Sequence, residues 1–243
     1  GYRPAPYYQT EFRHLFRDWL AENKIEYDWE NCDLFVKDTP MLDFKIYQQH
    51  KFYQTMYDHM RSIGVKIPIT GTNWTRGIDN IYAHRDMDFT DSHHYHYDWK
   101  WTNYNRICQN RSITSFPSIF PTMARMRVAN KPFFVSEWDA PWPNNYRAEG
   151  PIYYAAVAAL QNWSGLTIHT YSYNTRLTDM KVIGKEMSTT IGGVPHREGI
   201  FSTWNDPAKF GLFYHTALIM RRGDISPANK KEAVSMTPHA PKL

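Results

Sequence analysis

Glu137 ends a short, mostly apolar stretch, residues 133–137, and is followed at once by Trp138. A short apolar run bounded by polar residues is typical of a buried strand. A carboxylate at the end of such a strand can act as a nucleophile or exchange protons, because nearby burial and neighbouring charges tune its protonation. We therefore expect Glu137 to be catalytic, with a salt-bridged structural carboxylate as the alternative.

Polar and aromatic side chains also end three other segments that have the pattern of strands, at 65–74, 87–95 and 165–173. The carboxyl ends of parallel strands meet at one edge of an α/β sheet. We therefore expect these side chains to converge around Glu137. They are Thr72, Asn73 and Trp74 on the first segment, Asp91, His93, His94, Tyr95 and His96 on the second, and His169, Tyr171 and Tyr173 on the last.

This set of groups is suited to cleaving a glycosidic bond with retention of configuration. That reaction uses one carboxylate as nucleophile and a second, about 5 Å away, as acid and base. A tyrosine or histidine beside the nucleophile keeps it ionised and oriented, and amides match sugar hydroxyls as donor and acceptor. The expected catalytic residues are Glu137, Tyr95 and His93, and the expected substrate-binding residues are Asn73, Trp74, His94, Trp138 and Tyr171.

Each of these assignments has a structural alternative. His93 and Tyr95 can form a hydrogen-bonded pair in the core, and Asn73 can cap a strand. Aromatic side chains such as Trp138 and Tyr171 can pack loops instead of sugars.

Helical segments alternate with the strand segments. Apolar residues recur at helical spacing over 11–22 and 41–62, and further helices are expected at 147–163 and 206–221, with a weaker one at 117–130. This alternation predicts an α/β fold with a parallel sheet and helices outside it. Four strand–helix units make either an open sheet or half of a closed eight-stranded barrel, which needs about 250 residues.

Residues 131–166 resemble the seventh-strand segment of the clan A glycoside hydrolases, the cellulase-like (β/α)8 enzymes that include glycoside hydrolase family five. Residues 88–98, "DFTDSHHYHYD", resemble the sixth strand, 64–74 the fifth and 165–173 the eighth. Residues 4–20 resemble the segment that follows the fourth strand. The resemblance implies that Glu137 is the nucleophile and that His93 and Tyr95 are the family's His-x-Tyr pair.

The same resemblance implies a fold and a function for the chain. Residues 1–225 are expected to be the C-terminal half of a TIM barrel, strands five to eight, and residues 226–243 a linker or the start of another domain. The expected activity is retaining hydrolysis of a β-linked polysaccharide or oligosaccharide. The alternative is a carbohydrate-binding protein without catalysis.

The family's acid/base is the glutamate of an Asn-Glu pair that ends strand four, and this sequence contains no Asn-Glu pair. The chain is therefore expected to be a fragment that begins beyond that pair. Its expected partner is the missing N-terminal half of the barrel, and the fragment alone is expected to be inactive.

Composition argues against several other classes of protein. The net charge of +4 comes from scattered lysines and arginines, which does not favour a nucleic-acid partner. The sequence contains no run of about 18 apolar residues, so no membrane partner is expected. Cys32 and Cys108 are too few for a disulfide framework or a thiolate zinc site, and whether they form one disulfide stays open. No metal or other cofactor is expected, and a secreted or periplasmic location would suit an enzyme that degrades polysaccharides.

Overall fold

The computed structural model describes most of the chain, and its residues divide into two compact units that are treated separately. The described residues are 4–35, 38–73, 77–96, 100–101, 106–107, 110–115, 120–142, 144–171, 201–204 and 206–235. The first unit comprises Gly1–Gly71, Arg76–Asp88 and Ala233–Leu243, and the second comprises Thr72–Thr75 and Phe89–Glu232.

The first unit is helical over its described residues. Its helices are α1 (Pro6–Asn23), α2 (Thr39–Ser62) and α3 (Ile78–Ala83). Asp38 caps α2 by accepting a hydrogen bond from the backbone N–H of Met41 at 3.2 Å. The helices predicted over 11–22 and 41–62 are thus confirmed, whereas α3 was not predicted.

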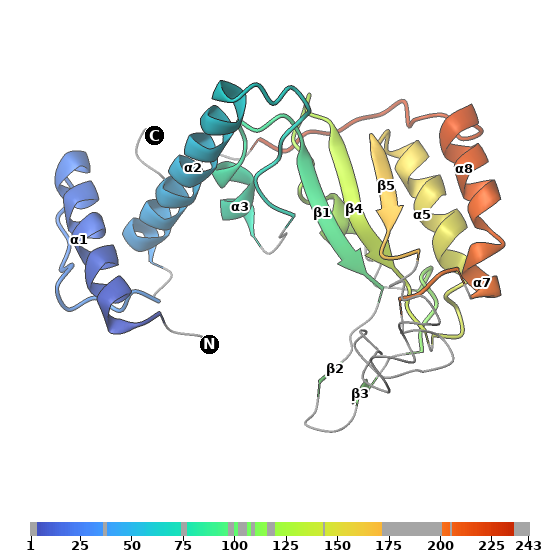
Figure 1. Ribbon diagram of the computed structural model, residues 1–243, viewed down its shortest axis with the longest axis horizontal. Coiled ribbons are helices and arrows are strands. Elements are labelled where there is room, and N and C mark those ends of the chain that lie inside the picture. Colours follow the sequence, from blue (N-terminus) through green and yellow to red (C-terminus); the bar gives the residue numbers. More distant parts are fainter. Residues whose placement is uncertain are drawn as a thin grey trace. The chain divides into compact units, whose positions relative to one another are not determined.

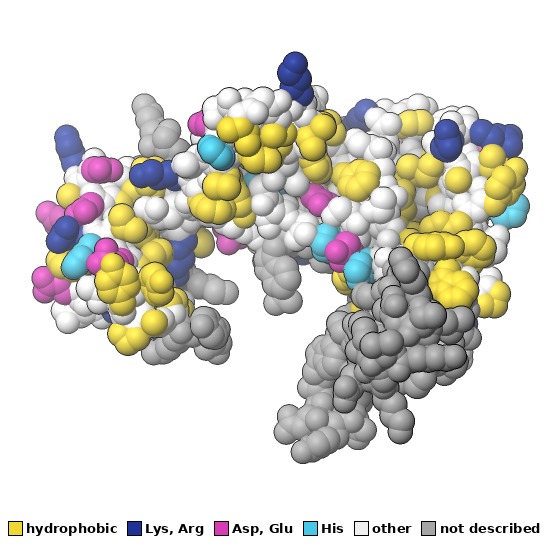
Figure 2. Space-filling view, viewed as in Figure 1, with side chains coloured by type: hydrophobic (Ala, Val, Ile, Leu, Met, Phe, Trp, Pro, Cys, Tyr) yellow, Lys and Arg dark blue, Asp and Glu magenta, His cyan; other side chains and the backbone are white. Residues whose placement is uncertain are grey.

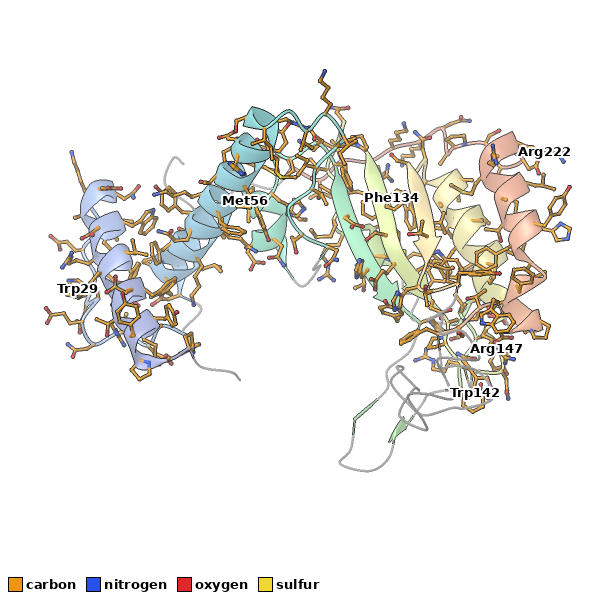
Figure 3. All side chains as sticks on the ribbon, in the orientation of Figure 1. Trp29, Met56, Phe134, Trp142, Arg147 and Arg222 are labelled. Atoms are coloured by element: carbon orange, nitrogen blue, oxygen red, sulfur yellow. The ribbon has the colours of Figure 1, made fainter. Side chains whose placement is uncertain are left out.

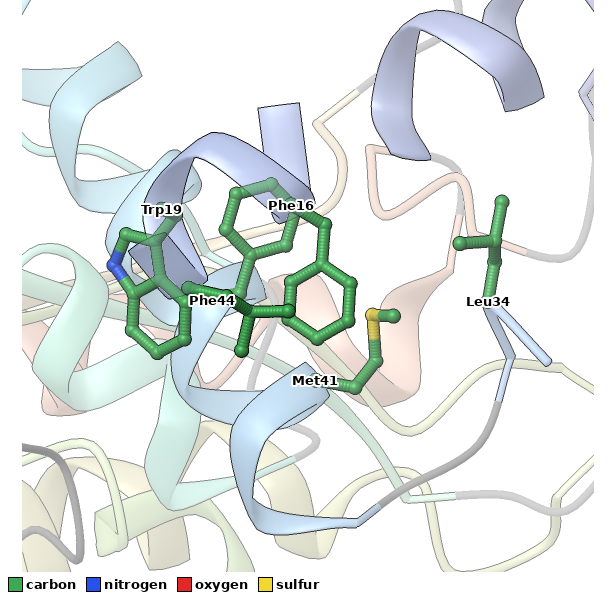
Figure 4. Close-up of a cluster of buried hydrophobic side chains, with 6 residues drawn as sticks. Phe16, Trp19, Leu34, Met41 and Phe44 are labelled. Atoms are coloured by element: carbon green, nitrogen blue, oxygen red, sulfur yellow. The ribbon is translucent and has the colours of Figure 1, made fainter. Parts of the chain in front are cut away.

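Aromatic side chains form the core between α1 and α2 (Figure 4). The rings of Phe16 and Phe44 lie with centroids 5.0 Å apart, and Trp19 lies 5.7 Å from Phe44. Helical spacing places these residues on the facing sides of the two helices. The buried members of the cluster are Phe16, Trp19, Leu20, Leu34, Met41 and Phe44.

The second unit contains a three-stranded parallel sheet (Figure 1). Its strands are β1 (Thr90–Tyr95), β4 (Phe133–Asp139) and β5 (Gly165–Ile168), in the order β1-β4-β5. Both neighbouring pairs are parallel. The prediction of an α/β fold with a parallel sheet is therefore confirmed at this level.

Among its described residues, the second unit also contains four helices and a small antiparallel pair of strands. They are α4 (Phe120–Ala124), α5 (Glu149–Leu160), α7 (Pro207–Phe210), α8 (Phe213–Arg222) and the antiparallel pair β2 (Lys100–Trp101) and β3 (Arg106–Ile107). Helix α5 lies beside α8 (Figure 1). The long helix predicted over 206–221 is divided, because α7 ends at Gly211 and α8 begins two residues later.

The segment predicted as a strand at 65–74 is not a strand in the residues that are described there. Two backbone hydrogen bonds hold it, from Asp88 N to Ile69 O at 3.0 Å and from His93 N to Asn73 O at 3.3 Å. Pro68 has no backbone N–H to donate, which weakens a regular ladder at this position.

Three further sequence predictions concern features at the level of the whole chain. No helix of the described residues is long and apolar enough to span a membrane. The predicted boundary between residues 225 and 226 stays a prediction. Cys32 has a free thiol, whereas Cys108 lies outside the described residues.

Candidate active site

A β-bulge in β4 places Glu137 at the carboxyl end of the sheet. Between two paired positions the register advances two residues on β1, from Asp91 to His93, but three on β4, from Phe134 to Glu137. The pairing of β4 with β5 is offset in the same region. An extra residue breaks the strict alternation of side chains. As a result Ser136 and Glu137, which are neighbours in sequence, both contact His93.

Side chains from all three strands meet at the Glu137 carboxylate. The Tyr95 hydroxyl donates a hydrogen bond to Oε2, and His93 Nδ1 lies 3.2 Å from the same oxygen. His169 directly follows β5, and its Nδ1 lies 3.9 Å from Oε1. The Glu137 side chain is 32% exposed, so a ligand can reach it. Figure 2 shows histidine and acidic side chains side by side where the strands end in Figure 1.

The structure thus brings Tyr95 and His93 to Glu137, as the sequence predicts. It also brings His169 there, a strand-end residue that the sequence placed on this rim without assigning it a catalytic or binding role. Burial lowers the pKa of His169, the Glu137 charge opposes this, and the charges of His93 and Lys209 reinforce it. His169 therefore stays neutral to lower pH than an ordinary histidine.

A second layer of polar groups supports His93. Asn73 Nδ2 lies 2.9 Å from His93 Nε2, and Ser136 Oγ lies 2.7 Å from the same nitrogen. Ser136 in turn donates from Oγ to Asp91 Oδ2 at 2.5 Å. The sequence placed Asp91 among the residues at a strand end but gave it no part in hydrolysis, and it did not single out Ser136, a polar residue in an otherwise apolar strand.

The other predicted substrate-binding residues differ in how exposed they are and in what they contact. Tyr171 is 62% exposed just beyond β5, with its ring centroid 6.2 Å from that of Phe210, so its face is available to a ligand. Asn73 touches His93, as described above, and is half-buried. His94 is half-buried and pairs in register with Trp138. Trp74 lies outside the described residues.

Trp138 does not line the site, contrary to the sequence prediction. Its side chain is 1% exposed, and its ring stacks on Tyr154 of α5 at 4.4 Å and on Phe213 of α8 at 6.2 Å. The residue after Glu137 on the strand faces the helices, where a large apolar ring fills the core. Trp138 is therefore a core residue that anchors β4 to the helices covering it.

A buried ion pair lies two residues beyond Glu137. Lys209 Nζ donates to both carboxylate oxygens of Asp139 at 3.0 Å, and both side chains are completely buried. Burial raises the pKa of Asp139 to about 7, while the Lys209 charge opposes the rise. Nearby, Arg147 Nε donates to Asp206 Oδ2 at 2.5 Å and joins the segment before α5 to the start of α7 (Figure 3 labels Arg147).

The described residues offer no ready metal site. Among them no three histidine, cysteine, aspartate or glutamate side chains are arranged to hold a metal ion. The two imidazoles at Glu137 contact the carboxylate itself, so what they can do there is orient it and hold protons beside it.

No protein-family model, curated protein or solved structure matches this chain. What the chain does must therefore be inferred from the geometry at Glu137.

Proposed function

We propose that this chain carries the nucleophile of a retaining glycoside hydrolase that acts on a β-linked polysaccharide or oligosaccharide. The observation that carries the proposal is the Glu137 carboxylate, a third exposed, with a phenol and two imidazoles around it. The phenol donates a hydrogen bond that aims the carboxylate, and the imidazoles beside it can carry protons next to the group that attacks an anomeric carbon.

The sheet supports a barrel origin for this site. Strands β1, β4 and β5 lie side by side in the order in which they occur along the chain, and they are parallel. The pair β2–β3 and helix α4 lie between β1 and β4 in the chain, and helix α5 lies between β4 and β5. This is the arrangement of consecutive strands in a (β/α)8 barrel, in which active sites lie at the carboxyl ends of the strands. The resemblance would make them strands six, seven and eight.

In the proposed reaction Glu137 attacks the anomeric carbon and forms a covalent glycosyl-enzyme, while Tyr95 and His93 hold its carboxylate in position. A second carboxylate protonates the departing oxygen and then activates water. The glutamate of an Asn-Glu pair that would supply this group is not a residue of this sequence. Tyr171 offers an exposed ring beyond β5 on which a sugar can stack.

A leaving group that needs no protonation tests the nucleophile without the acid/base. The 243-residue chain is incubated with a panel of dinitrophenyl 2-deoxy-2-fluoro-β-glycosides, whose glycosyl-enzyme turns over slowly, and is then analysed by mass spectrometry. We expect a mass increase of one fluoroglycosyl group, located by peptide mapping on Glu137.

Two variants make this experiment decisive. Glu137→Gln should abolish labelling, whereas Glu22→Gln, which changes an exposed glutamate on α1, should not. Labelling of another residue, or none with any sugar in a folded chain, would refute the proposal. If unlabelled chain still binds β-linked oligosaccharides in calorimetry, the carbohydrate-binding alternative, which the lack of an Asn-Glu pair favours, takes its place.

A further inference from the structure

Asp91 is a buried carboxylate whose charge no lysine or arginine of the described residues neutralises. It accepts three hydrogen bonds instead, from Ser136 Oγ at 2.5 Å, from Ser136 N at 2.9 Å and from Ser92 N at 2.7 Å. A buried charge is costly unless its partners are well arranged. The arrangement here connects Asp91 to His93 through one serine hydroxyl.

The serine hydroxyl has one hydrogen, and this decides the direction of the next bond. Because Asp91 accepts that hydrogen, Ser136 Oγ can only accept toward His93, whose Nε2 lies 2.7 Å away. Nε2 must therefore carry a hydrogen. The amide of Asn73, 2.9 Å from Nε2, then presents its oxygen to that hydrogen, which an amide does by turning over.

The other nitrogen of the ring faces the site. Nδ1 of His93 lies 3.2 Å from Glu137 Oε2, and that oxygen also accepts from Tyr95. We propose that Asp91, acting through Ser136, is a positioning residue that holds the His93 hydrogen on Nε2 and leaves Nδ1 as the nitrogen that exchanges protons beside Glu137. The significance of that proton for catalysis rests on the function proposed above, whereas the tautomer itself does not.

The network has a second self-consistent arrangement, which Asp91 excludes. If residue 91 donated to Ser136 Oγ, the serine hydrogen would turn to His93, Nε2 would become an acceptor, and the single hydrogen of the neutral ring would move to Nδ1. Asp91→Asn creates this case while keeping shape: the backbone N–H groups of Ser92 and Ser136 hold the new amide oxygen, so its NH₂ faces Ser136 Oγ.

Nitrogen-15 NMR of the full chain reads the tautomer directly. At a pH where the ring is neutral, we expect the protonated type of signal at Nε2 and the unprotonated type at Nδ1, with both signals identified by their loss in His93→Gln. In Asp91→Asn the two types should exchange. Ser136→Ala should exchange them as well, because Nδ1–H then donates to Glu137 while Asn73 donates to Nε2.

The double variant tests whether Asp91 acts through Ser136. Adding Asp91→Asn to Ser136→Ala should change nothing further in the His93 signals. Thr167→Val is the matched control, since Thr167 donates to the backbone oxygen of Ser136 at 2.6 Å and takes no part in the relay. It should leave the wild-type signals in place.

The outcomes separate this inference from the proposed function. Unchanged His93 signals in folded Asp91→Asn or Ser136→Ala would overturn the relay, whether or not fluoroglycosides label the chain. Exchanged signals in a chain that no fluoroglycoside labels would uphold the relay and refute the hydrolase.

Discussion

Two carboxylates on the same strand, Glu137 and Asp139, have opposite surroundings. Asp139 is completely buried and its charge faces Lys209 at 3.0 Å. Glu137 is partly exposed, and among the described residues phenol and imidazole groups contact it, whereas no lysine or arginine does. A lysine that pairs with a buried carboxylate neutralises its charge, whereas a phenol orients a carboxylate and leaves its charge available to a ligand. The contrast fits a structural role for Asp139 and the catalytic role that we propose for Glu137.

The largest expected effect is on stability at the buried pair. Above pH 7, where Asp139 is ionised, Lys209→Met leaves it buried without its counter-charge, and we expect the free energy of unfolding to fall by about 3–5 kcal/mol in urea titrations. Adding Asp139→Leu should restore most of the loss, because two apolar side chains need no counter-charge. Arg222→Met, which breaks the exposed pair with Asp224, is the control and should change little. Equal losses of unfolding free energy in Lys209→Met and Arg222→Met would show that the buried pair is no more important for stability than an exposed one.

The next effect is on the chemistry at Glu137. Tyr95→Phe removes a hydrogen bond to a charged group, worth about 1.5–3 kcal/mol, so labelling by a dinitrophenyl fluoroglycoside should slow about tenfold or more. The measurement is the rate constant for mass increase. Tyr214→Phe, an exposed tyrosine on α8, should label at the wild-type rate. A wild-type rate in Tyr95→Phe would mean that the phenol does not support the nucleophile.

The pH dependence of stability should report Asp139. Its pKa is about 7 in the folded chain and 3.8 in the reference state, so between these values the folded chain holds a proton that the unfolded chain has released. Its contribution to the free energy of unfolding is therefore complete below about pH 4 and is lost as pH rises toward 7. Urea titrations across this range should show the wild type losing stability relative to the Lys209→Met, Asp139→Leu double variant. Parallel curves would contradict the raised pKa.

The smallest effect concerns His169. Its pKa should lie below the usual histidine value because of burial, and the Glu137 charge should be what keeps it from falling further. Glu137→Gln removes that charge, so the pKa of His169 should drop again in an NMR titration. The unfolded chain binds the proton near the reference value of 6.5, before the folded chain does. The folding stability linked to His169 is therefore lost as pH falls from about 6.5 toward the lower pKa of the folded chain. An unchanged titration in Glu137→Gln would show that the two groups do not interact.

The sequence predicted the parts of this site that follow from the regular alternation of a strand. It did not predict the parts that depend on the bulge in β4. Residues 133–135 indicated β4, and Tyr95 and His93 reach Glu137 because they share a sheet edge with it. Ser136 escaped prediction because a bulge, which no alternating pattern contains, turns it toward His93. Trp138 was misassigned because its position beside Glu137 in the sequence says nothing about which face of the strand it occupies.

Helix boundaries show the same limit. Apolar spacing over 206–221 is continuous, so one helix was expected, yet Gly211 ends α7 and a new helix follows. Glycine is a poor residue for a helix interior. At 65–74 the apolar residues suggested a strand, but Pro68 cannot donate to a ladder.

The bulge exists because β4 has one more residue than its neighbouring strands between paired positions, and this limits how such a site can arise. No exchange of one amino acid for another restores an even ladder between β4 and its neighbours, because the surplus residue stays in the chain. Loss of a single codon there would restore it, and would turn either Ser136 or Glu137 away from His93. In evolution, this arrangement is gained or lost through insertion and deletion in the gene, and a site-directed deletion recreates that event in one step.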